Sequence, residues 1–224
     1  MNKSYQAVFF DLDGTLIDTA PDFRTVLNRM LRDHELPPLP LSEVRRHVSH
    51  GARAVICHGF DIHDSDPQFD DLLNGFLDRY AEHLAVDSRL FDGLNTLLLQ
   101  LEEKQIPWGI VTNKPLRFTA PLLEQLGLAT RVGPVICPDH VKICKPDPDA
   151  LLIAAAETGI AARRCIYIGD HLRDIQAGKN AGMLTVGVGY GYLDNNETAA
   201  DWQADITVQT VPQLSAALHP LLGL

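Results

Sequence analysis

The stretch Ala7-Val8-Phe9-Phe10-Asp11-Leu12-Asp13-Gly14-Thr15 carries the clearest structural signal in this chain. It begins with four apolar residues in a row and continues into two aspartates. An unbroken apolar run, rather than an alternating one, is typical of a strand that is buried on both faces of a parallel sheet. We therefore expect a buried strand at 7–10 that places Asp11 and Asp13 at its carboxyl end.

Similar apolar runs recur along the chain, and helical patterns lie between them. The further runs are 108–111, 132–136, 165–168, 184–188 and a weaker one at 206–208. Apolar residues at helical spacing, or helix start and stop signals, mark 94–101, 150–157 between Pro148 and Gly159, and 174–181 before Gly182. Strands that alternate with helices predict an α/β fold, in which helices flank a parallel sheet.

The stretch 18–88 breaks this alternation, because it contains no convincing strand. Apolar residues recur there at helical spacing, in two stripes: Phe23, Val26, Leu27, Met30 and Leu31, and then Phe69, Leu72, Leu73, Phe76, Leu77 and Tyr80. One or two shorter helices are expected between them, in 41–60. We predict an all-helical domain at 18–88, inserted after the first strand of an α/β core made of residues 1–17 and 89–224.

The composition restricts the possible partners. The 224 residues include 19 Lys and Arg against 29 Asp and Glu, a formal net charge of −10. No basic cluster is longer than Arg45-Arg46 or Arg163-Arg164, which argues against a nucleic-acid partner. No signal peptide is recognisable, and no apolar run approaches the ~20 residues of a membrane helix. We expect a cytoplasmic monomer or homodimer with four reduced cysteines and no membrane partner.

Polar residues follow the predicted strands at the points where they end. Asp11 and Asp13 follow the first strand, Thr112 and Asn113 the second, and Asp170 the run 165–168; Asp174 lies one helical turn further, and Lys145 lies in a loop. The ends of parallel strands meet at one edge of a sheet, so these groups should converge. Four carboxylates would repel one another without a cation. Mg²⁺ suits such a site, because it prefers carboxylate, phosphate and water oxygens.

The same residues resemble the motifs of the haloacid dehalogenase superfamily. The resemblance rests on Asp11-Leu12-Asp13-Gly14-Thr15, Thr112-Asn113, Lys145-Pro146 and Gly169-Asp170-x3-Asp174, which occur in the family's order. It implies the Rossmannoid core of that family and an aspartyl-phosphate intermediate on Asp11. Asp13 would then act as the general acid and base.

The resemblance also implies how the phosphate and the metal are bound. Thr112, the Asn113 backbone and Lys145 would hold the phosphoryl oxygens. Mg²⁺ would be bound by Asp11, the carbonyl of Asp13, Asp170 and Asp174. Dehalogenases of the superfamily lack an acid at the position of Asp13, so its presence favours phosphoryl transfer over cleavage of a carbon–halogen bond.

The helical insertion resembles the cap of the phosphoglycolate phosphatase branch of the superfamily. Its segment 45–53 stands where that branch carries its specificity residues, so Arg45, His50, Gly51 and Arg53 are predicted to bind substrate. Val48-Ser49-x-Gly51-Ala52 and Gly169-Asp170-His171 also resemble bacterial phosphatases that act on N-acetylmuramic acid 6-phosphate. We expect a Mg²⁺-dependent phosphatase for a small phosphorylated metabolite, either 2-phosphoglycolate or a carboxylated sugar phosphate.

Two alternative functions are compatible with this fold. A phosphomutase related to β-phosphoglucomutase would use the same core, and a non-catalytic regulatory protein would not need the intact set of catalytic residues. Gly187-x-Gly189-x-Gly191 lacks the spacing of a dinucleotide loop, and Cys137-x2-His140-x3-Cys144 lacks a fourth zinc ligand. His171 stands where the family often has Thr, and it either bonds a second carboxylate or covers the site.

Overall fold

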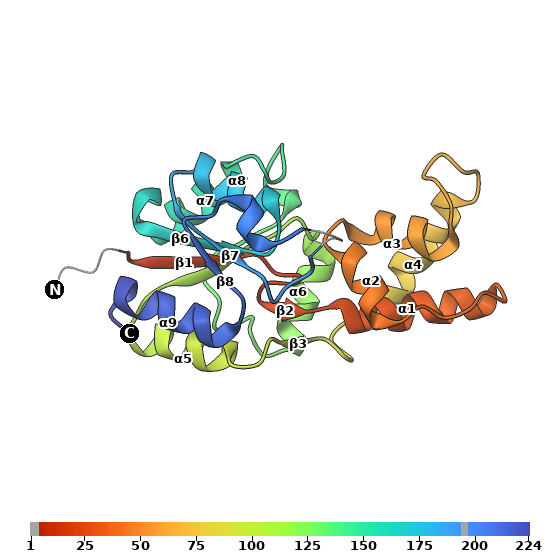
Figure 1. Cartoon of the computed structure of the whole chain (residues 1–224), viewed down its shortest axis with the longest axis horizontal. Coiled ribbons are helices and arrows are strands. Elements are labelled where there is room, and N and C mark those ends of the chain that lie inside the picture. The colour runs from red at the N-terminus through yellow and green to blue at the C-terminus, as the bar shows by residue number, and fades with distance from the viewer. Residues whose placement is uncertain (1–4, 194–196) are drawn as a thin grey trace.

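A six-stranded parallel sheet forms the centre of the larger part of the molecule (Figure 1). The computed structural model describes residues 5–193 and 197–224. In spatial order the strands are β5 (Val135–Ile136), β4 (Trp108–Val111), β1 (Ala7–Phe10), β6 (Cys165–Gly169), β7 (Leu184–Val188) and β8 (Ile206–Val208). Every neighbouring pair is parallel. The predicted α/β fold is therefore confirmed.

Helices cover both faces of the sheet. Figure 1 shows α5 (Leu94–Glu103) and α9 (Val211–Leu222) on one side, and α7 (Asp149–Thr158) and α8 (Leu172–Asn180) on the other. Successive side chains of β1 alternate between the two layers: Phe10 packs in the cluster of α5 and α9, and Phe9 in that of α7 and α8. All four residues of β1 are fully buried. This burial fixes the position at which the chain leaves β1.

Several elements differ from the sequence expectations. The strand expected at 132–136 begins only at Val135, because Pro134 has no N–H to donate to a neighbouring strand. Helix α8 begins at Leu172 instead of residue 174, because the His171 ring accepts a hydrogen bond from the Arg173 backbone N–H at 3.1 Å and caps the helix. Helices α6 (Leu116–Gln125) and α9 were not anticipated.

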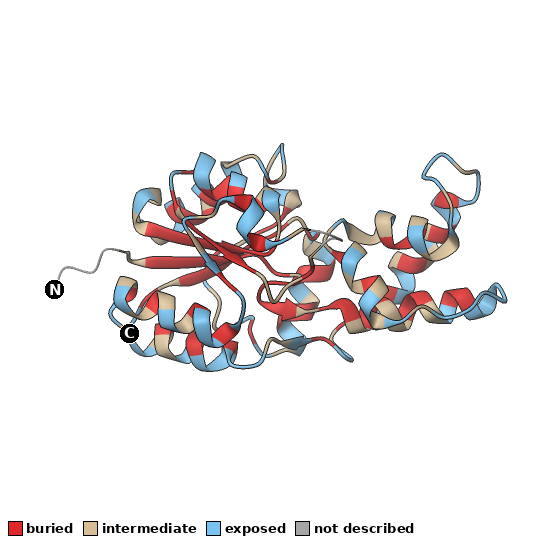
Figure 2. Cartoon of the chain, viewed as in Figure 1, coloured by how far each residue is buried: buried red, intermediate tan, exposed pale blue. Residues whose placement is uncertain are grey.

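Four helices lie between the short strands β2 (Ile17–Asp18) and β3 (Arg89–Leu90), and we call residues 19–88 the helical insertion. They are α1 (Ala20–Asp33), α2 (Leu41–Val48), α3 (Gly51–Phe60) and α4 (Phe69–Glu82). Figure 1 shows them grouped at one end of the long axis, and Figure 2 shows buried residues on the sides where they face one another. β2 and β3 pair antiparallel, so the two connections to the sheet run side by side. The exact division into core and cap stays a prediction.

No helix in the described ranges, 5–193 and 197–224, is both long and apolar enough to span a membrane.

Asp22 fastens the first helix of the insertion to the chain that returns to the core. Its carboxylate is fully buried. It accepts hydrogen bonds from the backbone N–H groups of Asp87 at 2.7 Å and Ser88 at 3.3 Å, and from the Ser88 hydroxyl. One side chain therefore satisfies three donors at the base of the insertion.

We expect Asp22→Ala to lower the free energy of unfolding by about 2–4 kcal/mol, because each buried donor left without an acceptor costs ~1–3 kcal/mol. Asp33 provides the matched control in the same helix, since its ion pair with Arg79 is exposed. Asp33→Ala should cost less than about 1 kcal/mol. Urea denaturation of both variants measures the difference, and equal losses would show that Asp22 does not fasten the insertion.

Candidate active site

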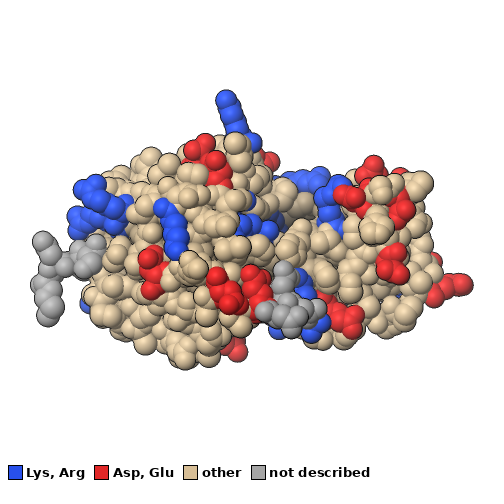
Figure 3. Space-filling view, turned by 45° about the horizontal axis from the view of Figure 1, so that its top comes forward, with Lys and Arg blue, Asp and Glu red and all other residues tan. Residues whose placement is uncertain are grey.

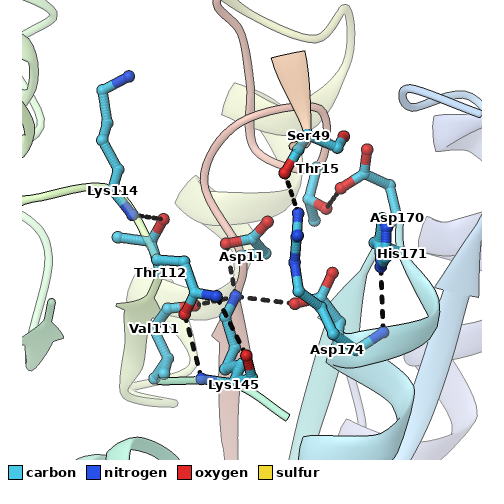
Figure 4. A network of polar contacts seen from close by, with 12 residues as sticks. Asp11, Thr15, Ser49, Val111, Thr112, Lys114, Lys145, Asp170, His171 and Asp174 are labelled. Carbon is cyan, nitrogen blue, oxygen red and sulfur yellow. Dashed lines mark hydrogen bonds and ion pairs between the residues drawn. The ribbon is translucent and has the colours of Figure 1, made fainter. Parts of the chain in front are cut away.

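A buried lysine joins two carboxylates at the carboxyl ends of the strands. Lys145 Nζ lies 2.7 Å from Asp11 Oδ1 and 2.7 Å from Asp174 Oδ1 (Figure 4). It also lies 2.9 Å from the Val111 carbonyl oxygen and 2.8 Å from the Tyr167 hydroxyl. The predicted meeting of Asp11, Asp174 and Lys145 is therefore seen in the structure.

The charge of Lys145 is maintained by its neighbours. Burial lowers the pKa of Lys145, but the carboxylates of Asp11 and Asp174 raise it by more, so that the net direction is upward. The group consequently stays an ammonium. Burial, followed by the charges of Asp174 and Asp11, raises the pKa of Tyr167 well above its usual value, so this phenol stays neutral.

Three aspartates form an acidic cluster beside Lys145. One oxygen from each of Asp11, Asp170 and Asp174 lies within 4.8 Å of the others. Asp170 accepts hydrogen bonds from the Thr15 hydroxyl and the Tyr192 backbone N–H, both at 2.8 Å. Burial raises the pKa of Asp170 well above its usual value, and the charges of Asp11 and Asp174 act in the same direction.

This cluster has the chemistry of a site for a hard divalent cation. Asp174 Oδ2 is buried and has no hydrogen-bond partner among the described residues. An orphaned carboxylate oxygen beside two further carboxylates is costly unless a cation binds there. The described residues therefore fit Mg²⁺, which takes oxygen ligands.

Two glycines leave the space that Asp170 occupies. A Cβ on Gly14, whose φ is +84°, would lie 2.1 Å from Asp170 Oδ2. A Cβ on Gly191 would lie 2.3 Å from Asp170 Cβ and 2.4 Å from the Gly14 carbonyl oxygen. Both distances are far below van der Waals contact. The loops after β1 and β7 therefore approach Asp170 so closely that only glycine fits.

The Asp13 carboxylate lies outside the acidic cluster. Its Oδ1 accepts hydrogen bonds from the Thr19 hydroxyl at 2.5 Å and from Lys114 Nζ at 3.0 Å. The side chain thus faces the helical insertion, while Asp11 faces Lys145. This placement leaves the predicted carbonyl ligand role of Asp13 untested and separates its carboxylate from the metal ligands.

Thr112 and Asn113 shape the loop after β4. The Asn113 side chain donates to the Lys145 carbonyl oxygen and accepts from the Lys145 N–H, both at 3.2 Å. The Thr112 hydroxyl accepts from the Lys114 N–H at 3.1 Å. Asn113 therefore holds the backbone of the loop that carries Lys145, in addition to the phosphate contact predicted for its own backbone.

A cavity of about 330 Å³ opens between the core and the helical insertion. The core contributes Asp11, Asp13, Thr112, Asn113, Lys114, Pro115, Arg117, Phe118, Lys145 and Arg173; the insertion contributes Phe23, Val48, Ser49, His50, Gly51, Ala52, Arg53, Leu77 and Tyr80. Figure 3 shows basic side chains at the junction of the two parts, on a face that also carries many acidic ones. The predicted phosphate-binding residues thus line the core side of a space large enough for an organic group.

Three of the four predicted insertion residues line this cavity, and Arg45 does not. His50, Gly51 and Arg53 belong to its wall. Arg45 instead pairs with Asp18, and its guanidinium lies 5.7 Å from the centre of the Tyr192 ring. The structure therefore places Arg45 beside the connection between core and insertion.

The predicted cavity residues differ in how firmly they are held. The Arg53 side chain is 59% exposed and lies 3.3 Å from Asp64. An exposed ion pair of this kind contributes little free energy, so Arg53 can exchange Asp64 for another anionic partner. The His50 ring meets the His171 ring edge to face, with centroids 5.3 Å apart. His171 therefore contacts the insertion.

Lys114, Arg173 and Tyr80 are among the cavity residues whose part in the site was not predicted from the sequence. Lys114 directly follows the motif Thr112-Asn113, and Arg173 lies inside Gly169-Asp170-x3-Asp174, directly before Asp174. Arg173 donates a hydrogen bond to the Ser49 carbonyl oxygen of the insertion. Tyr80 was assigned to an apolar stripe, whose spacing does not show that the hydroxyl forms a polar contact at the cavity. For Lys114 and Arg173, a position in or next to a recognised motif was the signal in the sequence that could have identified them.

Comparisons with known proteins agree with this geometry. Residues 5–182 match the family model described as haloacid dehalogenase-like hydrolase. An N-acetylmuramic acid 6-phosphate phosphatase of Pseudomonas aeruginosa is 47% identical, over 97% of this chain and 96% of that protein. A phosphoglycolate phosphatase of Xanthomonas campestris pv. campestris is 42% identical, over 93% of this chain and 94% of that protein.

Solved structures show the same fold. A crystal structure described as a predicted phosphoglycolate phosphatase from Haemophilus somnus superposes with a TM-score of 0.84 at 24% identity, covering 97% of this chain and 99% of that one. The prediction of an enzyme of this superfamily is confirmed. On its motifs, its fold and its relatives, the chain belongs to the haloacid dehalogenase-like hydrolase family.

Proposed function

We propose that this protein is a Mg²⁺-dependent phosphatase that hydrolyses a carboxylated sugar phosphate through a phosphoryl intermediate on Asp11. The supporting observation is the environment of Asp11, which lies beside Asp170 and Asp174 and within 2.7 Å of Lys145. A second acid, Asp13, lies two residues further along, and both line the cavity. A nucleophile, an acid and a cation site at one end of a cavity are the parts that phosphoryl transfer needs.

The residues divide the reaction into two steps. In the first, an Asp11 oxygen bonds to phosphorus, the ester P–O bond breaks, and Asp13 gives its proton to the departing alkoxide. In the second, Asp13 takes a proton from water while the water oxygen bonds to phosphorus and the bond to Asp11 breaks. Bound Mg²⁺ would supply positive charge that offsets the phosphate and the three carboxylates.

The cavity favours N-acetylmuramic acid 6-phosphate over 2-phosphoglycolate. Its volume of about 330 Å³ is in the range that holds a ligand with several functional groups, and 2-phosphoglycolate is much smaller. Phe23 and Phe118 offer it apolar contact, while Arg53 and Arg173 offer two-pronged binding of a carboxylate. The relative from Pseudomonas aeruginosa carries the name of that activity.

Two other functions use the same residues. Phosphoglycolate hydrolysis is favoured by the names of other relatives, and phosphomutation needs the same nucleophile. The cytoplasmic location and the monomeric or dimeric state stay predictions.

Phosphate release from a panel of phosphomonoesters tests this proposal. We expect turnover of N-acetylmuramic acid 6-phosphate that exceeds turnover of 2-phosphoglycolate and stops when a chelator removes Mg²⁺. Asp11→Asn should fold and show a loss of at least about 10³-fold, because an amide is a poor nucleophile. The proposed reaction would be overturned by any of three results. These are turnover that persists in the presence of a chelator, a rate in Asp11→Asn close to that of the wild type, and isomerisation without phosphate release.

The metal site has its own test. Gly191→Ala should weaken Mg²⁺ binding by at least about 10-fold, because the new methyl group must displace Asp170, and displaced ligands lose affinity. Gly75→Ala is the matched control, since a Cβ there meets only Met30 Cε at 3.8 Å. Isothermal titration with Mg²⁺ measures both variants. Unchanged affinity in Gly191→Ala would exclude Asp170 as a ligand.

Substrate selectivity should depend on the insertion residues that line the cavity. Arg53→Ala should lower kcat/KM for N-acetylmuramic acid 6-phosphate by about 10- to 100-fold, the value of a charged hydrogen bond of ~1.5–3 kcal/mol. His50→Ala should act in the same direction. Turnover of 4-nitrophenyl phosphate, which has no carboxylate, should fall by less than about 3-fold in both. Arg46, an exposed neighbour outside the cavity, is the control; losses that are equal on both substrates contradict the assignment.

A further inference from the structure

Lys114 lies where the core meets the helical insertion. Its side chain is 5% exposed. Its Nζ donates to Asp13 Oδ1 at 3.0 Å and to the Tyr80 hydroxyl, on α4, at 2.9 Å. In Figure 4 the side chain extends from the Thr112 loop away from Asp11 and Lys145. One buried ammonium therefore bonds an acid of the core and a hydroxyl of the insertion.

Two aromatic rings of the insertion lie close to the Lys114 ammonium. Lys114 Nζ lies 4.8 Å from the centre of the Tyr80 ring and 5.1 Å from that of Phe23. Such faces attract a cation, but a buried charge also requires a counter-charge. Among the described residues, Asp13 is the carboxylate with which Lys114 forms an ion pair. Each of the two aspartates in the Asp11-x-Asp13 motif thus has its own lysine.

Tyr80 stays a neutral phenol at this position. Burial, followed by the charges of Asp13 and Asp22, raises its pKa well above the usual value. Its oxygen accepts the hydrogen bond from Lys114. Tyr80 belongs to α4, so a displacement of that helix would move one of the two partners of the Lys114 ammonium.

We propose that Lys114 is a positioning residue for the acid–base group Asp13, and that Tyr80 makes this positioning depend on the helical insertion. The proposal rests on the phosphatase function argued above. Asp13 Oδ1 accepts both the Lys114 N–H and the Thr19 O–H, so these two donors fix the orientation of the acid beside the cavity. Loss of the Lys114 contact therefore misplaces the group that must reach the leaving oxygen.

The dependence on the leaving group tests this role. An alkyl oxygen must be protonated as it departs, whereas 4-nitrophenolate departs without a proton, so a defect in the acid shows mainly on alkyl esters. Lys114→Met should lower kcat/KM by at least about 100-fold on N-acetylmuramic acid 6-phosphate and by less than about 5-fold on 4-nitrophenyl phosphate. Asp13→Asn should give the same pattern, and Lys104→Met, at an exposed lysine, should change neither.

The contribution of the insertion is tested separately. Tyr80→Phe keeps the ring and removes the hydroxyl, and we expect a loss of about 5- to 10-fold on the alkyl ester and less than about 2-fold on the aryl ester. In the Lys114→Met background the same change should have no further effect, because the two groups act in series. Additive losses would overturn the link to Tyr80.

The outcomes separate this proposal from the phosphatase function. A wild-type protein that hydrolyses neither ester would contradict the proposed function itself. A wild-type protein that hydrolyses both, with a Lys114→Met variant that loses equally on both or on neither, would overturn the role of Lys114. If thermal unfolding shows that Lys114→Met is not folded, Tyr80→Phe decides alone, and an equal loss on both esters or no loss overturns the proposal.

Discussion

Buried negative charge at the ends of β1 and β6 is the constraint around which the molecule is arranged. Asp170 and Asp174 are 1% and 0% exposed, and each has an oxygen within 4.8 Å of Asp11. Such a group is unfavourable without positive charge inside the protein. Lys145 supplies one charge, which requires its loop to reach across β4 to β1. The orphaned Asp174 oxygen shows that this one charge does not satisfy the cluster.

The same constraint explains why the acids of the Asp11-x-Asp13 motif have different surroundings. Asp11 is held by Lys145 within the core, whereas Asp13 is held by Thr19 and Lys114 at the border of the insertion. In the reaction proposed above, the nucleophile Asp11 must stay ionised and close to the cation, while the acid–base group Asp13 must exchange a proton with the substrate. Placing each carboxylate beside a different lysine lets one short loop serve both requirements.

The sequence was sufficient to predict the groups that meet at the strand ends, but not the contacts between core and insertion. Apolar runs locate the ends of β1 and β6. Because these strands are parallel neighbours, Asp11 and Asp170 lie together independently of how the loops are folded. Arg45 was predicted to bind substrate, but spacing does not give the rotation of α2, which turns this side chain to Asp18. The hydrogen bond between Lys114 and Tyr80 joins residues 34 positions apart in the sequence. Tyr80 belongs to an apolar stripe, and the spacing of such a stripe does not indicate which partner its hydroxyl will have.

The basic side chains that line the cavity fall into two groups, those paired with the aspartates of the Asp11-x-Asp13 motif and those that are not. The chain has a net charge of −10, yet five basic side chains line the cavity: Arg53, Lys114, Arg117, Lys145 and Arg173. Two of these, Lys145 and Lys114, are neutralised by aspartates of the motif. Under the proposed function the arginines would attract an anionic substrate by its other charged groups, since the pair that Arg53 forms with Asp64 is exposed. Since Arg53 comes from the insertion and Arg173 from the core, a substrate held by both, as we propose, would bridge the same junction that Lys114 spans beside Asp13.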